Sequence, residues 1–465
     1  MSQHGRRTFL KLSGGVLGGI FAGSTVTAAE RTDRFIVDTT QTSPATLQAA
    51  GLELDHVIEQ VDLAVVFGAE SDLKSTRATY EPDLSYTLEK PRDGTLEAQY
   101  EVDNESPGNG KGKGTGGGTA SDSTVDESLY PLQWDKQAQD LSSAHHVTKG
   151  EGSRVAIIDS GVYADHPDLD VNLELSRNFT GDGEGAGVPA GDDHGTHVAG
   201  TVAASDNGSG VIGTAPAAEV VDCRVFSYAP GASFGDILAA VAYSAAIDAD
   251  VANLSLGAYP VPREGIGGFY GKSLNRVMTY ANNEGTLLVI AAGNDTADLQ
   301  HDGGFISLPN EGAQAVSVAA TGPVGFGWGD DGLESPVESP AFYTNYGTNA
   351  ITLGAPGGDA DLEATGTGVP WYNDLVLSTT ADVSYEYDTN GNPIDYLDAE
   401  PTYGWKAGTS MAAPQVAGAA ALVKSANPSY NAGQVESALK GAAEVPDGYD
   451  KAYYGSGFLN VVDAL

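Results

Sequence analysis

One stretch organises this chain of 465 residues: Gly408-Thr409-Ser410-Met411-Ala412-Ala413-Pro414-Gln415-Val416-Ala417-Gly418. Its serine stands among small residues, directly ahead of an alanine-rich apolar run over 412–423 that predicts a helix. Proline in a first helical turn removes only an N–H that has no partner, so Pro414 predicts a helix start within a residue or two of Ser410. A hydroxyl there lies at the positive end of a helix dipole, where developing negative charge is stabilised. Taken alone, the stretch is also compatible with a buried helix start whose capping serine is incidental.

The composition is strongly acidic. The chain has 63 Asp and Glu against 23 Lys and Arg, a formal net charge of −40, and the acidic residues are spread along its length. Such a surface repels nucleic acid and anionic membranes, so we expect neither as a partner. Spread acidic charge is typical of a solvated coat suited to high salt, because molar salt screens repulsion beyond about 3 Å. The one cysteine, Cys223, excludes an intramolecular disulfide.

The N-terminal 29 residues predict an export signal. Gly5-Arg6-Arg7-Thr8-Phe9-Leu10-Lys11 is a twin-arginine pattern, and a short, glycine-rich, weakly apolar run follows it over 12–28. We therefore expect residues 1–29 to be a cleaved twin-arginine signal peptide, the product to be secreted, and no stable membrane anchor to remain. An uncleaved anchor is the alternative.

Residues 30–100 predict a small unit of their own. Strands are expected over 35–37, 52–57, 63–67 and 85–88, and helices over 44–50 and 71–76. The order β-α-β-β-α-β predicts a ferredoxin-like α+β fold. Residues 101–128 follow as a flexible, cleavable linker, since 105–123 are rich in Gly, Ser and Lys and poor in apolar residues.

Residues 129–465 alternate apolar strands with helices, which predicts an α/β domain with a mainly parallel sheet. We expect strands over 154–158, 220–225, 251–255, 286–291, 316–319 and 351–355, and helices over 195–204, 235–246, 274–283, 414–426 and 432–442. Residues 322–341 and 384–400 interrupt the alternation and are expected to be acidic surface insertions. The second contains Asn390-Gly391, a hairpin signal.

Polar residues stand where these elements meet. Asp159 ends an apolar strand, His194 begins a helix, and Asn294 follows a buried strand. Open α/β sheets place their sites at the carboxyl ends of strands. With Ser410 these residues supply the base, orienting carboxylate, amide donor and nucleophile that acyl transfer requires. Asp159 alone would more often be a turn former, and the usual zinc-binding spacings are absent.

Four motifs together resemble the signatures of the subtilisin-like serine proteases: Asp159-Ser160-Gly161-Val162, His194-Gly195-Thr196-His197, Ala291-Ala292-Gly293-Asn294 and Gly408-Thr409-Ser410-Met411-Ala412-Ala413-Pro414. The resemblance runs from about residue 133 to 465 and is similar to the exported haloarchaeal members. It implies a three-layer α/β/α fold, and the leading unit resembles the family's inhibitory propeptide. It also implies Ser410 as nucleophile, His194 as general base, Asp159 as its orienting carboxylate and Asn294 as oxyanion donor.

The resemblance extends to residues that would bind the substrate. Ser255, Leu256 and Gly257 match the strand that pairs with the substrate backbone, and Gly231 belongs to a second such strand. Walls and floor of the specificity pockets would come from Ala292, Gly293, Ser307 and Phe234. Phe234 could equally be an ordinary core aromatic. The small Ser307 leaves room for a large apolar P1 side chain, and Asp295 would add an acidic group at the rim.

The loop over 205–211 resembles the family's calcium loop. The ligands that the resemblance implies are Asp168, Ser205, Asn207, Ser209 and Val211. Calcium takes six to eight oxygen ligands, many of them backbone carbonyls. An ordinary loop at the end of a helix is the alternative.

These features together predict a monomeric, secreted serine endopeptidase of broad specificity, made as a self-processing zymogen. Its partners would be protein or peptide substrates and its own propeptide, and calcium would be its cofactor. A catalytically dead binding protein on the same fold is the main rival. A carboxylesterase is disfavoured because no Gly-x-Ser-x-Gly elbow surrounds Ser410.

Overall fold

The computed structural model describes residues 30–86, 97–99, 125–228, 231–263 and 266–465. The predicted signal peptide and residues 101–124 of the predicted linker lie outside these ranges. Within them, no helix is both long and apolar enough to cross a membrane.

A seven-stranded parallel sheet forms the centre of the larger unit. Its strand order is β15-β14-β12-β10-β6-β8-β7. The strands are β6 (Arg154–Asp159), β7 (Arg177–Asn178), β8 (Glu219–Arg224), β10 (Val251–Leu254), β12 (Leu287–Ala291), β14 (Ala315–Thr321) and β15 (Leu353–Pro356). The predicted α/β architecture with a mainly parallel sheet is therefore confirmed.

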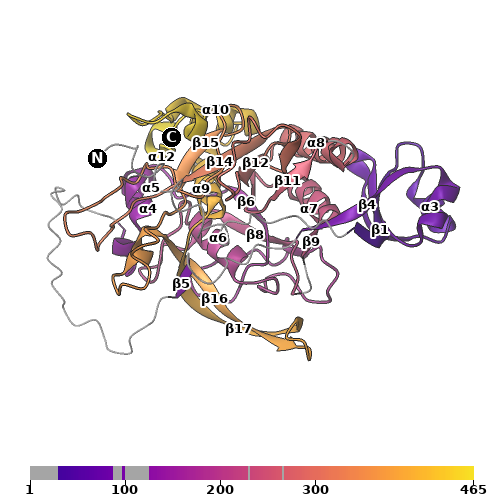
Figure 1. Ribbon diagram of the computed structural model, residues 1–465, viewed down its shortest axis with the longest axis horizontal. Coiled ribbons are helices and arrows are strands. Elements are labelled where there is room, and N and C mark those ends of the chain that lie inside the picture. The colour runs from indigo at the N-terminus through magenta and orange to yellow at the C-terminus, as the bar shows by residue number, and fades with distance from the viewer. Residues whose placement is uncertain (1–29, 87–96, 100–124, 229–230, 264–265) are drawn as a thin grey trace.

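Helices cover both faces of this sheet (Figure 1). Successive strand residues point to opposite faces, and on β6 Val155 and Ile157 join one core while Ala156 and Ile158 join the other. The first core includes α6 (His194–Ala203), α9 (Thr409–Ala426) and α10 (Ala432–Ala442); the second includes α7 (Phe234–Ala246) and α8 (Ile266–Glu284). Shorter helical turns are η3 (Tyr130–Leu132), α4 (Trp134–Ala138), α5 (Leu141–His145), η4 (Trp371–Asp374), α11 (Lys451–Tyr454) and α12 (Val461–Ala464).

Helix α9 begins at Thr409, next to Ser410, as predicted, but the reason given for Pro414 is wrong. Pro414 is the sixth residue of the helix and lies inside it. A proline there has no N–H for the carbonyl four residues earlier, which is that of Ser410. The Ser255 hydroxyl donates to this carbonyl instead, at 2.8 Å.

The leading unit has the predicted element order: β1 (Glu30–Asp38), α2 (Pro44–Ala49), β2 (Glu53–Ile58), η1 (Glu59–Val61), β3 (Leu63–Phe67), α3 (Glu70–Thr76) and β4 (Thr79–Tyr86). Its strands pair in the order β2-β3-β1-β4, all antiparallel. The last strand was wrongly placed at 85–88: it spans Thr79–Tyr86, where Tyr80, Pro82 and Leu84 alternate with polar residues, a period-2 pattern that the prediction missed.

The leading unit also joins the larger one. Ser85 and Tyr86 of β4 pair antiparallel with β9 (Ala232–Ser233), just before α7. Arg34 of β1 is 2% exposed and forms ion pairs with carboxylates from both units: Asp55, Asp83 and Asp236. Because Asp236 lies on α7, this buried cation links the leading unit to the helix.

Of the two predicted surface insertions, the first is partly buried and the second is mostly exposed, as predicted. The second belongs to a long hairpin of β16 (Val376–Tyr387) and β17 (Pro393–Lys406), whose turn contains the predicted Asn390-Gly391. The other end of the hairpin is buried, because residues 376–381 pack against α6. In the first, 322–341, the chain turns around buried Asp374, whose carboxylate accepts from Gly325 N, Phe326 N and Trp328 Nε1. A further antiparallel pair, β11 (Ala258–Pro262) and β13 (Phe305–Leu308), lies beside α8.

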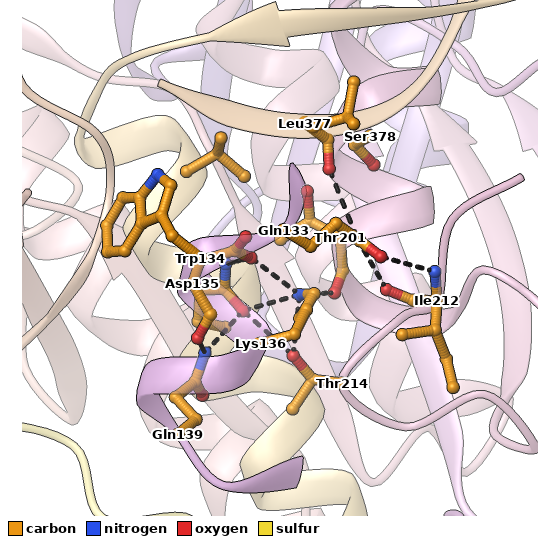
Figure 2. Close-up of polar contacts among 12 residues, drawn as sticks. Gln133, Trp134, Asp135, Lys136, Gln139, Thr201, Ile212, Thr214, Leu377 and Ser378 are labelled. Atoms are coloured by element: carbon orange, nitrogen blue, oxygen red, sulfur yellow. Dashed lines mark hydrogen bonds and ion pairs between the residues drawn. The ribbon is translucent and has the colours of Figure 1, made fainter. Parts of the chain in front are cut away.

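A buried polar network connects α4 to helices α6 and α9 (Figure 2). Lys136 is fully buried and pairs with Asp135 at 3.3 Å. Its ammonium donates to Thr201 O of α6 at 2.9 Å and to Gln415 Oε1 of α9 at 2.7 Å. Burial lowers the pKa of Lys136, against the charge of Asp135. The network therefore fixes α6 and α9 relative to each other.

Candidate active site

Asp159 and His194 lie together at the carboxyl edge of the sheet. Asp159 is the last residue of β6 and His194 the first of α6. The His194 Nδ1–H donates to Asp159 Oδ1 at 2.8 Å, and the Ser160 N–H donates to the same oxygen at 2.7 Å. Asp192 fixes the backbone here by accepting from His194 N at 2.8 Å. Nδ1 is thereby held protonated, which leaves Nε2 available as a base.

The surroundings of His194 favour its charged form. Burial lowers its pKa, but the charge of Asp159, their hydrogen bond and the charge of Asp192 outweigh this and raise the pKa to about 9. His197, one turn along α6, is fully buried and hydrogen-bonds to Val376 O through Nε2. Burial lowers the pKa of His197 well below its usual value, so it is a neutral core histidine.

Ser410 lies in the first turn of α9. Its hydroxyl donates to Ser255 O at 3.3 Å, while the Ser255 hydroxyl donates to Ser410 O. Asn253 Nδ2 in turn donates to Ser255 Oγ at 2.9 Å. Among the described residues the Ser410 hydroxyl has no hydrogen bond to His194; catalytic hydrogen bonds often form only when substrate binds.

Asn294 presents its amide to the same turn. Its Oδ1 accepts from the Thr409 N and Oγ1 at 2.9 and 3.0 Å, which directs Nδ2 the other way. A methyl group on Gly408 would lie 3.5 Å from both Asn294 Nδ2 and Ser410 N. Both nitrogens therefore lie near one position beside Gly408, next to the serine.

Two predicted substrate-binding residues contact the turn that carries Ser410: Ser255 through its hydroxyl and Gly293 through its N–H. Phe234, Leu256 and Gly257 line one apolar pocket, together with Phe226, Ile237, Leu308 and Pro309. Phe234 is thus both a buried aromatic, 2% exposed and edge-on to Tyr270, and a pocket wall. Gly231 directly precedes β9, so it adjoins the strand that pairs with β4.

Ala292 and Gly293 follow β12, and the Gly293 N–H donates to Thr409 Oγ1 at 3.0 Å. Ser307 lies on β13 and is 2% exposed, with its backbone N–H donating to Glu311 Oε2 at 2.6 Å. The carboxylate of Asp295 accepts from Asn345 Nδ2 at 3.2 Å, so it is held by a neighbouring amide. Glu311 and Asn345 were not predicted and carry no sequence signal at these positions.

The predicted calcium loop forms a hydrogen-bonded turn around Asp168. The Asp168 carboxylate accepts from Asn207 Nδ2 (3.0 Å), Val211 N (3.1 Å) and Tyr403 Oη (2.8 Å). Ser205 N donates to Asp168 O, and Ser209 N to Asn207 Oδ1. The structure adds carboxylates that were not predicted: those of Asp126, Glu127 and Asp206 lie within 4.8 Å of one another. Glu127 is 3% exposed, and its Oε2 has no hydrogen-bond partner among the described residues.

Comparison with known proteins assigns the family. The family model described as "Subtilase family" matches residues 150–457. The chain is 32% identical over 314 residues to Subtilisin Savinase of Lederbergia lenta, covering 67% of this chain and 90% of that protein. It is 31% identical over 354 residues to an extracellular protease of Xanthomonas campestris pv. campestris, covering 68% of this chain and 51% of that protein. This chain therefore belongs to the subtilase family and is a subtilisin-like serine protease.

A solved structure supports the fold over almost the whole chain. The epidermin leader peptide processing serine protease of Staphylococcus aureus superimposes with a TM-score of 0.67 at 20% identity, covering 93% of this chain and 97% of that one. The predicted subtilisin-like architecture is thus confirmed.

Proposed function

We propose that this chain is the precursor of an exported serine endopeptidase that removes its own leading unit. The observation that carries the proposal is that hydrogen bonds join Asp159 to His194 and Asn294 to the turn of Ser410, while the Lys406–Asp193 ion pair brings the segments before Ser410 and His194 together. Ser410 attacks the substrate carbonyl while His194 Nε2 takes its proton, and His194 later gives that proton to the leaving amine. Asp159 stabilises the imidazolium formed in between, and Asn294 Nδ2 and the Ser410 N–H stabilise the oxyanion.

The leading unit acts in this proposal as an intramolecular inhibitor. Tyr86 of β4 pairs with Ala232, next to Gly231 and two residues before Phe234 of the apolar pocket. An extended segment paired there occupies the edge on which a substrate strand would lie. The buried cluster around Arg34 and the bond from the Tyr270 hydroxyl to Pro82 O hold the unit on α7 and α8.

Export, specificity and metal binding complete the proposal. The Arg6-Arg7 pattern supports the twin-arginine route, and an extracellular relative supports export itself. The small Ser307 beside Ala292 and Gly293 supports a large apolar P1 side chain. For calcium, the loop carbonyls with Asp168, Asn207 and the unpartnered Glu127 Oε2 are a hard oxygen donor set of the kind that Ca²⁺ prefers. The ion would brace the loop that follows α6.

Self-processing is tested by replacing the nucleophile. The purified precursor should shorten on incubation, react at Ser410 with a fluorophosphonate and hydrolyse casein. We expect Ser410→Ala to stay at its export-processed length and to lose labelling and activity. Ser425→Ala, on the same helix, is the matched control and should mature normally. A Ser410→Ala protein that matures to the same N-terminus would contradict self-processing, and an unlabelled wild type would favour the dead homologue.

A further inference from the structure

A short strand from outside the leading unit pairs with the catalytic unit at a second place. β5 (Glu97–Gln99) lies antiparallel to the end of β17, with Glu97 opposite Lys406, Ala98 opposite Trp405 and Gln99 opposite Gly404. We call the strand segment 404–406 the β17 edge. A Cβ on Gly404 would come within 3.1 Å of Ala98 O, so the backbones approach closely there. Ala98 also packs against the apolar cluster that contains Trp405 and Leu377.

The β17 edge carries a buried cation. The Lys406 side chain is 7% exposed, and its ammonium lies 2.9 Å from Glu97 Oε1 and 3.1 Å from Asp193 Oδ1. Burial lowers the pKa of Lys406, but Asp193, Glu97 and Asp192 together raise it above its usual value. The ammonium therefore stays charged and binds two carboxylates, that of Glu97 on β5 and that of Asp193 just before α6.

This cation lies beside the catalytic groups. Asp193 directly precedes His194, and Lys406 is four residues before Ser410. His194 delivers its proton to the leaving amine, so the leaving-group side of a substrate lies on the histidine side of Ser410. The residues that pair with the acyl side, Ser255 to Gly257, instead follow β10. The β17 edge thus adjoins the leaving-group side.

The direction of β5 agrees with this placement. From Glu97 to Gln99 the chain runs from Lys406 toward Gly404, away from the serine. Earlier in the chain, β4 pairs with β9 beside the acyl-side pocket. The two pairings are well separated on the molecule (Figure 1). The precursor therefore touches the enzyme in the order in which a bound peptide would, acyl side first.

We infer that Lys406 of the β17 edge selects an acidic side chain on the leaving-group side of extended peptide substrates. β5 occupies this edge in the precursor, with Glu97 in the place of the substrate's acidic residue. The inference rests on the proposed function and adds a specificity determinant to it. Backbone pairing gives the edge its affinity for any extended chain, and the buried ammonium gives it a preference.

The test uses the mature, fluorophosphonate-reactive enzyme and internally quenched peptides. All peptides share one acyl-side sequence and carry a single Glu or Gln at the second, third or fourth position after the cleaved bond. We expect the wild type to prefer Glu at one of these positions by roughly 10- to 100-fold in kcat/KM, the range of a hydrogen bond to a charged group. Lys406→Gln should bring this ratio close to 1, and Lys406→Arg should keep most of it.

The ratio is measured within each enzyme preparation, so a general loss of activity in a variant does not move it. If Lys406→Gln fails to fold, the wild type alone decides: a Lys-bearing peptide must be cleaved more slowly than its Gln counterpart at the same position. A wild type indifferent to Glu, Gln and Lys, or a Glu preference that survives in Lys406→Gln, would overturn the inference. Labelling and casein hydrolysis test the protease itself, so an active but indifferent enzyme leaves the proposed function standing.

Discussion

His194 is held between opposing influences, since burial disfavours its charge while Asp159 and Asp192 favour it. A general base has to be neutral to accept a proton, so in the proposed mechanism the carboxylates that orient the His194 ring also raise the pH at which it can act. The consequence is a conflict between activity and stability over a defined pH range. A histidine pKa raised in the folded state stabilises the fold below the unfolded value of about 6.5, and this contribution is lost as the pH rises through about 9.

We therefore predict that kcat/KM rises with pH through an apparent pKa near 9. Asp192→Asn keeps an oxygen for the His194 N–H but removes a negative charge, so the rise should move to lower pH, by about half a unit. A pH profile with a peptide substrate, at constant salt, measures both. Asp331→Asn, on an exposed loop, controls for loss of one charge. A wild-type midpoint near 6.5 would contradict the prediction.

Among the elements, the loop after α6 depends on carboxylates that come from far away in the chain. Glu127 Oε1 accepts from Gly208 N at 3.3 Å while Oε2 is buried without a partner, an arrangement that is costly unless a cation or water compensates it. The loop should therefore be stable only when this charge is balanced.

We expect removal of calcium with a chelator to lower the melting temperature of the mature enzyme. An ion at 100 times its Kd stabilises the native state by about 2.7 kcal/mol. Glu127→Gln should reduce the difference between calcium-loaded and chelated melting temperatures, and Asp331→Asn should not. Calcium binding is checked independently by titration calorimetry. Identical melting curves with and without calcium would rule out a stabilising site.

The sequence predicts those parts of the site that lie in continuous motifs at element ends. Asp159, His194, Asn294 and Ser410 each stand where an apolar run meets a turn, so their positions follow from periodicity and motif. Lys406 and Glu97 do not: they are 309 positions apart, and a three-residue strand such as β5 has no periodicity to detect. The bond from Ser255 to Ser410 O escapes prediction for the same reason, since it depends on how α9 packs against β10.

At the scale of the whole molecule, 63 acidic side chains against 23 basic ones concentrate like charge on the folded surface. The repulsion reaches about 30 Å at 0.01 M ionic strength and about 3 Å at 1 M. Some of the cations form internal links: Arg34, Lys136 and Lys406 are all nearly buried. These three do not offset the surface charge.

We predict that the enzyme unfolds, and loses activity with its fold, when salt is removed. Circular dichroism and casein hydrolysis, measured together from dilute buffer to several molar NaCl at fixed calcium, should change in parallel. Sucrose at matched osmolality is the control, because it favours compact states without screening charge. Full stability and activity in dilute buffer would refute the adaptation to salt and leave the protease assignment intact.

The two separate pairings, β4 on β9 and β5 on β17, make the N-terminal segment a bivalent ligand of its own enzyme. Each contact raises the effective concentration of the other, so the pair can hold far more tightly than either strand alone. The position of the processing cut then sets the strength of the product as an inhibitor. A cut beyond residue 99 releases a fragment that keeps both contacts and dissociates slowly. A cut between residues 86 and 97 separates them: the leading unit then keeps only its own contacts with α7, α8 and β9, while β5 stays covalently joined to the enzyme.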